Sequence, residues 1–280
     1  MHTDPQKTHT EKRFLHYPTL RDHPLKSAHT WIQGKRIDDD VGDYWRVYNK
    51  LYDLTHFADI HPGGKDWIRS TRGTDITELF ECYHISDTPQ TLLKRYYVKD
   101  ITTPRNSPYT FNNDGFYKTF KRKVKPILKE IGRGPTHTML LLQDGLALTY
   151  VLLTLAATLT ESYTIAVLAG LVLSLTMIGA HNFFHQRDNL RMYYFDLSLL
   201  SSYDWRITHG ISHHIYPNTI YDFEVSVLEP GRQEGPGSGR GMGEVQARGF
   251  FARVSVGVDG VVYVVYIDGG EVVGYNTHEL

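Results

Sequence analysis

The chain has 280 residues, which is too long for one small domain and predicts about two domains. Its formal net charge is −1, from 30 Lys and Arg against 31 Asp and Glu, so no basic field marks a nucleic-acid-binding protein and we expect no nucleic-acid partner. The single cysteine excludes an intramolecular disulfide framework and a cysteine-based zinc cluster.

Composition divides the chain into five segments. Residues 1–30 are polar and show no signal-peptide pattern, which predicts a flexible N-terminal arm. Residues 31–103 have the mixed polarity of a small globular domain. Residues 104–138 join a Pro-, Asn- and Ser-rich linker to a basic juxtamembrane run. Residues 139–230 indicate a partial membrane domain, and residues 231–280 form a Gly/Val-rich tail of unknown role, in which we expect irregular chain or short strands.

Two apolar stretches, about 139–159 and 162–180, contain between them one charge, Asp144, and each is long enough to cross a bilayer. The link around Glu161 is short, so two spans would form a helical hairpin; the alternative is a pair of buried core helices. The basic run before the first stretch predicts that the N-terminal part, and everything after the hairpin, is cytosolic. Gln143 and Asp144 would lack partners in lipid, which predicts low stability for this half unless it oligomerises.

The most specific local motif is His61-Pro62-Gly63-Gly64. Pro62 restricts His61 to an extended conformation, and the two glycines permit positive φ and leave room for a large flat ligand. His84 follows 23 residues later. Two histidines from separate helix-turn units can take both axial positions of one haem iron, which leaves one-electron transfer as the role of that iron.

These residues resemble the cytochrome b5 domain, over about Trp31 to Ile101. The resemblance implies haem b held by His61 and His84, with a flavin-dependent cytochrome b5 reductase as electron donor. The alternative is a haem-less relic of the same fold. His56, five residues before His61, is expected at the surface and not as a ligand.

A second group of histidines begins where the second apolar stretch ends. His181 and His185, at i and i+4, share one helix face and can hold one metal. His209, His213 and His214 supply three more imidazoles, and we expect His209 and His213 to share a face in the same way. Five histidines without cysteine favour iron, zinc or a similar metal; the alternative is interfacial histidines that meet lipid headgroups.

These HxxxH and HxxxHH patterns resemble the first two histidine boxes of membrane fatty acid desaturases and related hydroxylases. The resemblance implies a non-haem di-iron centre beside the endoplasmic reticulum membrane, electrons supplied by cytochrome b5, and a lipid or acyl chain as substrate. A closer resemblance, from about Tyr17 to Pro230, is to the family of insect cytochrome b5-related proteins, through TWIQGKR, GTDITELFE, HNFFHQRDN and WRITHGISHHIYPN.

The desaturase pattern continues with two further spans and a third histidine box, but His278 is the only histidine after His214. We therefore expect a truncated domain with an incomplete di-iron site, assign no catalytic residue and leave open whether the chain is an enzyme. The change of composition at Glu229-Pro230-Gly231 favours alternative splicing or a mispredicted exon as the origin of the tail.

The predicted fold is therefore an α+β cytochrome b5-like haem domain, followed by the α-helical transmembrane hairpin of a truncated desaturase-like domain. The predicted function is a multi-pass membrane haem protein that passes electrons through a bis-histidine haem to the fused lipid-modifying domain. Two alternatives stay open: a membrane-tethered electron carrier without catalytic activity, because the third box is missing, and a non-catalytic remnant or regulatory isoform.

Overall fold

The computed structural model of the chain describes residues 14–132, 134–228, 254–258, 261–268 and 271–276. The chain divides into two compact units: Met1–Lys125 with Gly134–Pro230, and Pro126–Arg133 with Gly231–Leu280. The first unit contains all the histidines to which the sequence assigns chemistry.

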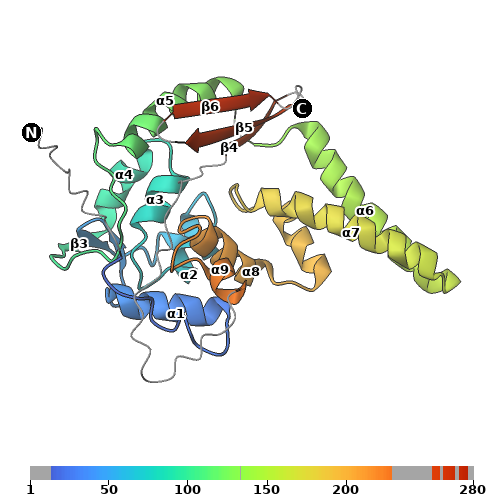
Figure 1. Cartoon of the computed structure of the whole chain (residues 1–280), viewed down its shortest axis with the longest axis horizontal. Helices are drawn as coiled ribbons and strands as arrows, with labels where there is room; N and C mark the ends of the chain where they lie inside the picture. The colour runs from blue at the N-terminus through green and yellow to red at the C-terminus, as the bar shows by residue number, and fades with distance from the viewer. Residues whose placement is uncertain (1–13, 133, 229–253, 259–260, 269–270, 277–280) are drawn as a thin grey trace, which may run out of the picture. The chain divides into compact units, whose positions relative to one another are not determined.

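The N-terminal part of the first unit combines short helices with a small sheet (Figure 1). The sheet has the order β1-β2-β3 and is antiparallel throughout, with Trp45 opposite Tyr52. Its strands are β1 (Trp45–Val47), β2 (Lys50–Tyr52) and β3 (Tyr97–Asp100), and its helices are α1 (Ala28–Asp39), η1 (Ala58–Ile60), α2 (Lys65–Ser70), α3 (Thr77–Tyr83), α4 (Thr88–Leu93) and η2 (Lys94–Tyr96).

Trp45 lies at the centre of the core of this domain. Its side chain is buried and its indole N–H donates to the carbonyl of Ile68, at 2.9 Å. Val47, Leu54 and Phe80 pack in the same cluster, so strand β1 is joined to helices α2 and α3. Because α2 follows His61 and α3 precedes His84, this core fixes the two segments that carry the predicted haem ligands.

Parts of the predicted arm and linker pack against the rest of the first unit. The ring of Phe14 lies 5.0 Å from that of Tyr221, and the backbone N–H of Leu15 donates to the side chain of Asn106. Arg105 reaches two buried carboxylates, Asp75 and Glu78, at 2.6 and 2.5 Å. The linker therefore supplies a charge that the interior of the domain requires.

The remaining described residues of this unit are helical, apart from their connections. Helix α5 (Phe116–Ile131) extends from the first unit into the second and contains Pro126. The other helices are α6 (His137–Thr160), α7 (Tyr163–Phe183), η3 (Leu190–Ser198), α8 (Ser202–Trp205), the π-helix η4 (Arg206–His213) and α9 (Phe223–Leu228).

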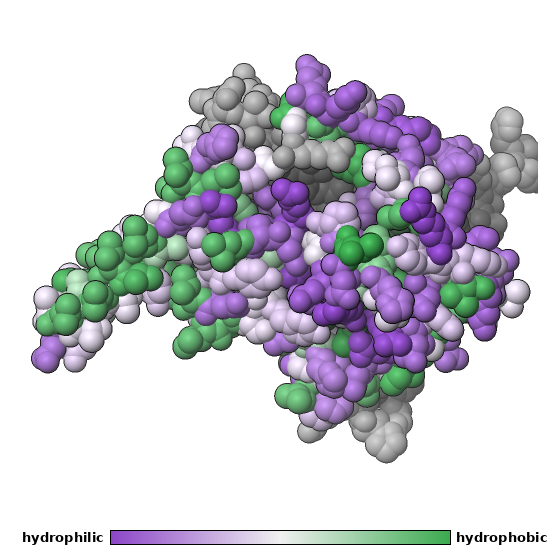
Figure 2. Space-filling model, turned by 180° about the vertical axis from the view of Figure 1, so that it is seen from behind, coloured by the Kyte–Doolittle hydropathy of each residue, from purple (hydrophilic) through white to green (hydrophobic). Residues whose placement is uncertain are grey.

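Helices α6 and α7 pack side by side as the predicted hairpin and are long and apolar enough to cross a membrane. Thr136 and Ser162 cap their N-termini, and Glu161 adopts a left-handed conformation in the turn between them. Figure 2 shows that the projecting hairpin is covered with hydrophobic residues. Leu152, Leu159 and many other large apolar side chains on it are exposed, which indicates association with a membrane and not a buried core pair.

The expectation that Gln143 and Asp144 lack partners is wrong. The amide of Gln143 is buried and donates to the carbonyl of Thr176 in α7, at 2.8 Å. Asp144 accepts from Arg191 at 2.6 Å and from the hydroxyl of Tyr194 at 2.9 Å. Residues of α7 and η3 thus satisfy both polar groups, which the apolar stretch alone did not reveal.

The described part of the second unit includes a three-stranded antiparallel sheet of order β4-β5-β6. Its strands are β4 (Val254–Val258), β5 (Val261–Asp268) and β6 (Glu271–Asn276). Short strands are one of the two forms expected for the tail, and the α+β domain and the helical hairpin also agree with the predicted fold class. The predicted Glu229–Gly231 junction lies outside the described residues.

Replacement of Arg105 tests the buried charge network. The Arg105→Ala variant leaves Asp75 and Glu78 buried without their main partner, which we expect to lower the free energy of unfolding by about 3 kcal/mol. Urea unfolding followed by tryptophan fluorescence measures this loss.

The matched control is Lys50→Ala, because Lys50 and its partner Asp100 are both exposed. An exposed pair contributes less than about 1 kcal/mol. Equal, small losses for Arg105→Ala and Lys50→Ala would contradict the structural role assigned to the linker.

Candidate functional site

His61 is held by the tight turn that its neighbours form. It ends η1 with φ −65° and ψ 120°, the extended conformation expected before Pro62. Gly64 has φ 120°, which other residues rarely adopt, and its carbonyl oxygen lies 2.8 Å from Nδ1 of His61. Since a carbonyl can only accept, Nδ1 carries the proton and Nε2 keeps its lone pair.

The ring of His84 is likewise oriented by a hydrogen bond to a backbone carbonyl. It follows α3, and its Nδ1 donates to the carbonyl of Phe80, at 2.9 Å. Burial lowers the pKa of His84, so the ring is neutral near pH 7. Both predicted haem ligands therefore offer a free Nε2.

The separation of the two rings fits a shared iron. The ring centroids of His61 and His84 are 6.2 Å apart. Two metal–nitrogen bonds of about 2.0 Å each, together with the radii of two imidazole rings, sum to roughly this separation. Phe57 contacts the first ring and Phe80 the second, at 5.6 and 5.0 Å between centroids, which provides apolar walls. His56 is exposed, as predicted.

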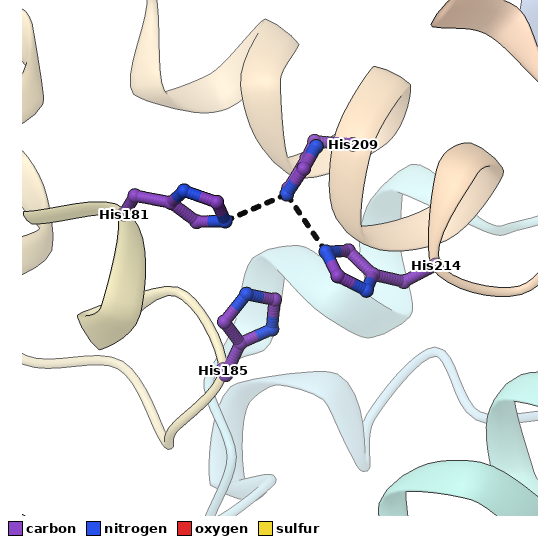
Figure 3. Close-up of side chains that lie close together, drawn as sticks. All are labelled: His181, His185, His209 and His214. Carbon is purple, nitrogen blue, oxygen red and sulfur yellow. Dashed lines mark hydrogen bonds between the residues drawn. The ribbon is translucent and has the colours of Figure 1, made fainter. Parts of the chain in front are cut away.

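Four of the five remaining candidate histidines converge at the end of the hairpin: His181, His185, His209 and His214. One ring nitrogen from each lies within 4.8 Å of the others. Figure 3 shows His181 and His185 approaching from the end of α7 and His209 and His214 from the η4 segment. Nε2 of His209 lies 2.8 Å from Nε2 of His181 and 2.7 Å from Nε2 of His214.

The fifth histidine, His213, shares a face with His209 as expected, since the two rings stack with centroids 5.4 Å apart, but it is not among the four histidines that converge. Segment η4 is a π-helix, in which the N–H of His214 donates to the carbonyl of His209, at 2.9 Å. This wider turn also brings position i+5, which is His214, close to position i, which is His209. Nδ1 of His213 instead lies 3.0 Å from a carboxylate oxygen of Asp222, which is fully buried.

The pKa of His213 shifts in the opposite direction to those of the cluster histidines. Burial and the neighbouring rings lower the pKa of His185 to about 4 and those of His209 and His214 to about 3. The hydrogen bond to Asp222 raises the pKa of His213. The cluster rings outside the membrane helices are thus neutral near pH 7, which is the form that binds a metal.

Glu224 was missed by the sequence analysis. One of its oxygens lies 2.5 Å from Nδ1 of His209, so it fixes the tautomer that directs Nε2 into the cluster. Carboxylates in this position orient metal-bound imidazoles and raise their basicity. Asp222 and Glu224 are single acids in a short segment, and the sequence carries no spacing signal that links them to histidines so far before them.

Comparison with known proteins agrees with this geometry. The model of the cytochrome b5-like heme/steroid binding domain matches residues 30–102. A cytochrome b5-related protein of Drosophila melanogaster is 43% identical over 214 residues, 76% of this chain and 49% of the relative. That of Drosophila virilis is 43% identical over 119 residues, 42% of this chain and 83% of the relative. The Delta(5) fatty acid desaturase A of Dictyostelium discoideum is 32% identical over 125 residues, 44% of this chain and 26% of the relative.

Fold and match together define a protein with an N-terminal cytochrome b5-type haem-binding domain and an apolar helical hairpin, associated with a membrane. Such a domain supports the role of an electron carrier. The chain belongs to the family of cytochrome b5-related proteins. It spans about half the length of the Drosophila melanogaster relative, at 49%.

Replacement of Glu224 tests the metal-binding capacity of the four-histidine cluster. The Glu224→Gln variant keeps the shape of the side chain but loses the charge behind His209, and we expect it to bind Co²⁺ about 10–100-fold more weakly. Titration of the full chain in detergent, followed by the visible absorption of Co²⁺, measures the affinity.

The control is Glu161→Gln, at the exposed turn of the hairpin, which leaves the affinity unchanged. If Glu224→Gln binds Co²⁺ as tightly as the wild type, the cluster does not bind metal through the geometry described.

Proposed function

We propose that the chain is a membrane-bound haem protein in which His61 and His84 are the axial ligands of haem b. The observation that carries the proposal is the pair of rings 6.2 Å apart, each with Nδ1 donating to a backbone carbonyl and Nε2 free. A haem bound in this way supplies a reversible one-electron couple. The protein contributes both ligands, their fixed tautomers and the apolar walls formed by Phe57 and Phe80.

We further propose that the acceptor of these electrons is the fused desaturase-like domain. Support comes from the convergence of His181, His185, His209 and His214 and from the similarity to a fatty acid desaturase. The donor set, imidazole nitrogens with a carboxylate behind one of them, suits iron and other borderline metals. In this proposal a non-haem iron site lies close to the end of the hairpin, so its substrate is a lipid or acyl chain of the bilayer.

The proposed location is the endoplasmic reticulum membrane, with two passes. The run of Lys and Arg in α5 favours a cytosolic N-terminal side, and a two-helix hairpin returns the chain to that side. The haem domain and the histidine cluster then share the cytosol. A flavin-dependent cytochrome b5 reductase is the proposed electron donor.

A second candidate function is a membrane-tethered electron carrier without catalytic activity. It is favoured because the described residues bring four imidazole nitrogens together, whereas a di-iron centre takes more ligands, and Nδ1 of His213 lies against Asp222. The haem site is the same under both candidates. They differ in whether non-haem iron is bound and whether lipids change.

Replacement of the two ligands tests the haem proposal. We expect His61→Ala and His84→Ala each to abolish the six-coordinate low-spin absorption of the haem and its reduced-minus-oxidised difference spectrum, because one axial position loses its ligand. His56→Ala is the control, since this exposed histidine lies in the same segment, and it retains the wild-type spectrum. A wild-type spectrum for either ligand variant would refute the assignment.

Expression of the full chain separates the two candidates. Non-haem iron in addition to haem iron, together with altered unsaturation or hydroxylation of cellular acyl chains, is the result expected of the desaturase-like function. Haem iron alone, with unchanged lipids, establishes the carrier without catalytic activity. The measurements are metal analysis of the purified protein and gas chromatography of total acyl chains.

A further inference from the structure

The segments that carry the two histidine sites contact each other directly within the first unit. Asp188, three residues after His185, is the centre of this contact. Its backbone N–H donates to the carbonyl of Gly63, at 2.9 Å, two residues after His61. The loop of the candidate haem ligand is therefore hydrogen-bonded to the segment that follows the first histidine pair.

The carboxylate of Asp188 joins two further groups. It accepts from the indole N–H of Trp67 at 3.0 Å and from the guanidinium of Arg206 at 2.7 Å. Arg206 is 2% exposed and Asp188 22% exposed, and the guanidinium of Arg206 also lies over the ring of Trp67, 4.8 Å from its centroid. Because an ion pair so shielded loses most of its hydration, it is stable only while its partners stay in place.

An apolar core lies beside this polar contact. Ala28 and Ile32 of α1 pack with Ile207 and Ile211 of η4, and Trp67 packs against the same cluster. Gly210 of η4 allows the close approach, since a Cβ on it would lie 2.9 Å from the ring of Trp67. Close packing, the ion pair and apolar burial therefore all favour the same orientation of the haem domain on the histidine-cluster segment.

A further hydrogen bond links the segments that carry His84 and His209. The hydroxyl of Tyr83 donates to the carbonyl of Gly210, at 3.1 Å. Tyr83 precedes His84 and Gly210 follows His209. One side-chain hydrogen bond thus joins the immediate neighbours of a haem-ligand candidate and a cluster histidine.

We propose that the haem domain is docked on the histidine-cluster segment in a single orientation, and is not a mobile module on a linker. Asp188 forms the polar centre of the contact together with Trp67 and Arg206, and Gly210 is a second point at which the two surfaces approach closely. This inference goes beyond the proposed electron transfer and requires neither site to hold iron.

Hydrogen exchange of the full, haem-loaded chain in detergent tests the docking. In a helix, replacement of glycine by alanine ordinarily stabilises the structure, whereas in Gly210→Ala the new methyl group meets Trp67. We expect Gly210→Ala and Asp188→Asn each to speed amide exchange in residues 60–70 at least tenfold, with the haem spectrum and the exchange of α6 and α7 unchanged. Gly170→Ala is the matched control, because nothing lies within 4 Å of the added Cβ.

The reciprocal variant is Trp67→Phe, which keeps a ring but removes the indole N–H that Asp188 accepts. Its expected effect is faster exchange across the contact, in residues 185–192. If Asp188→Asn does not fold, Trp67→Phe still tests the docking, because it changes the haem-domain side of the same contact. Unchanged exchange in residues 60–70 of folded Gly210→Ala, or in residues 185–192 of Trp67→Phe, would overturn the proposal. Loss of the haem spectrum alone would count against the proposed function and not against docking.

Discussion

An imidazole ring offers a metal one directed nitrogen only when its other nitrogen is fixed by a hydrogen-bond acceptor. The described residues satisfy this constraint at His61 and His84 with backbone carbonyls and at His209 with Glu224. Burial then keeps His84 and His209 neutral by lowering their pKa values. Both candidate sites thus depend on oxygen atoms behind the rings as much as on the rings themselves.

Local sequence predicted the features that local geometry determines. The prediction of His61 as a haem ligand follows from the Pro-Gly-Gly turn beside it. The spacing of 23 residues to His84, within the cytochrome b5-like pattern, predicts the second ligand. The hairpin follows from the length of two apolar stretches. Its first helix exceeds the predicted limits by one or two residues at each end, and its second begins one residue later and ends three residues later than predicted. In each case the physical cause lies within about twenty residues of the signal.

Features that depend on distant partners were missed. Gln143 and Asp144 are satisfied by Thr176, Arg191 and Tyr194, which lie more than 30 residues further along the chain. The position of His214 over His209 depends on a π-helical turn, which α-helical spacing does not predict. The partners of such single polar residues are known only from the folded structure, because they come from separate segments of the chain.

The close contact at Gly210 also bears on the kinetics of the proposed electron transfer. Under the proposed electron transfer, placing the donor and the acceptor in one polypeptide gives them a high effective concentration. Encounter by diffusion would then be replaced by an intramolecular event, whose rate is independent of the protein concentration. Trp67 and Tyr83 are both engaged in this contact, so the part of the haem domain that they cover would be less accessible to a competing electron acceptor.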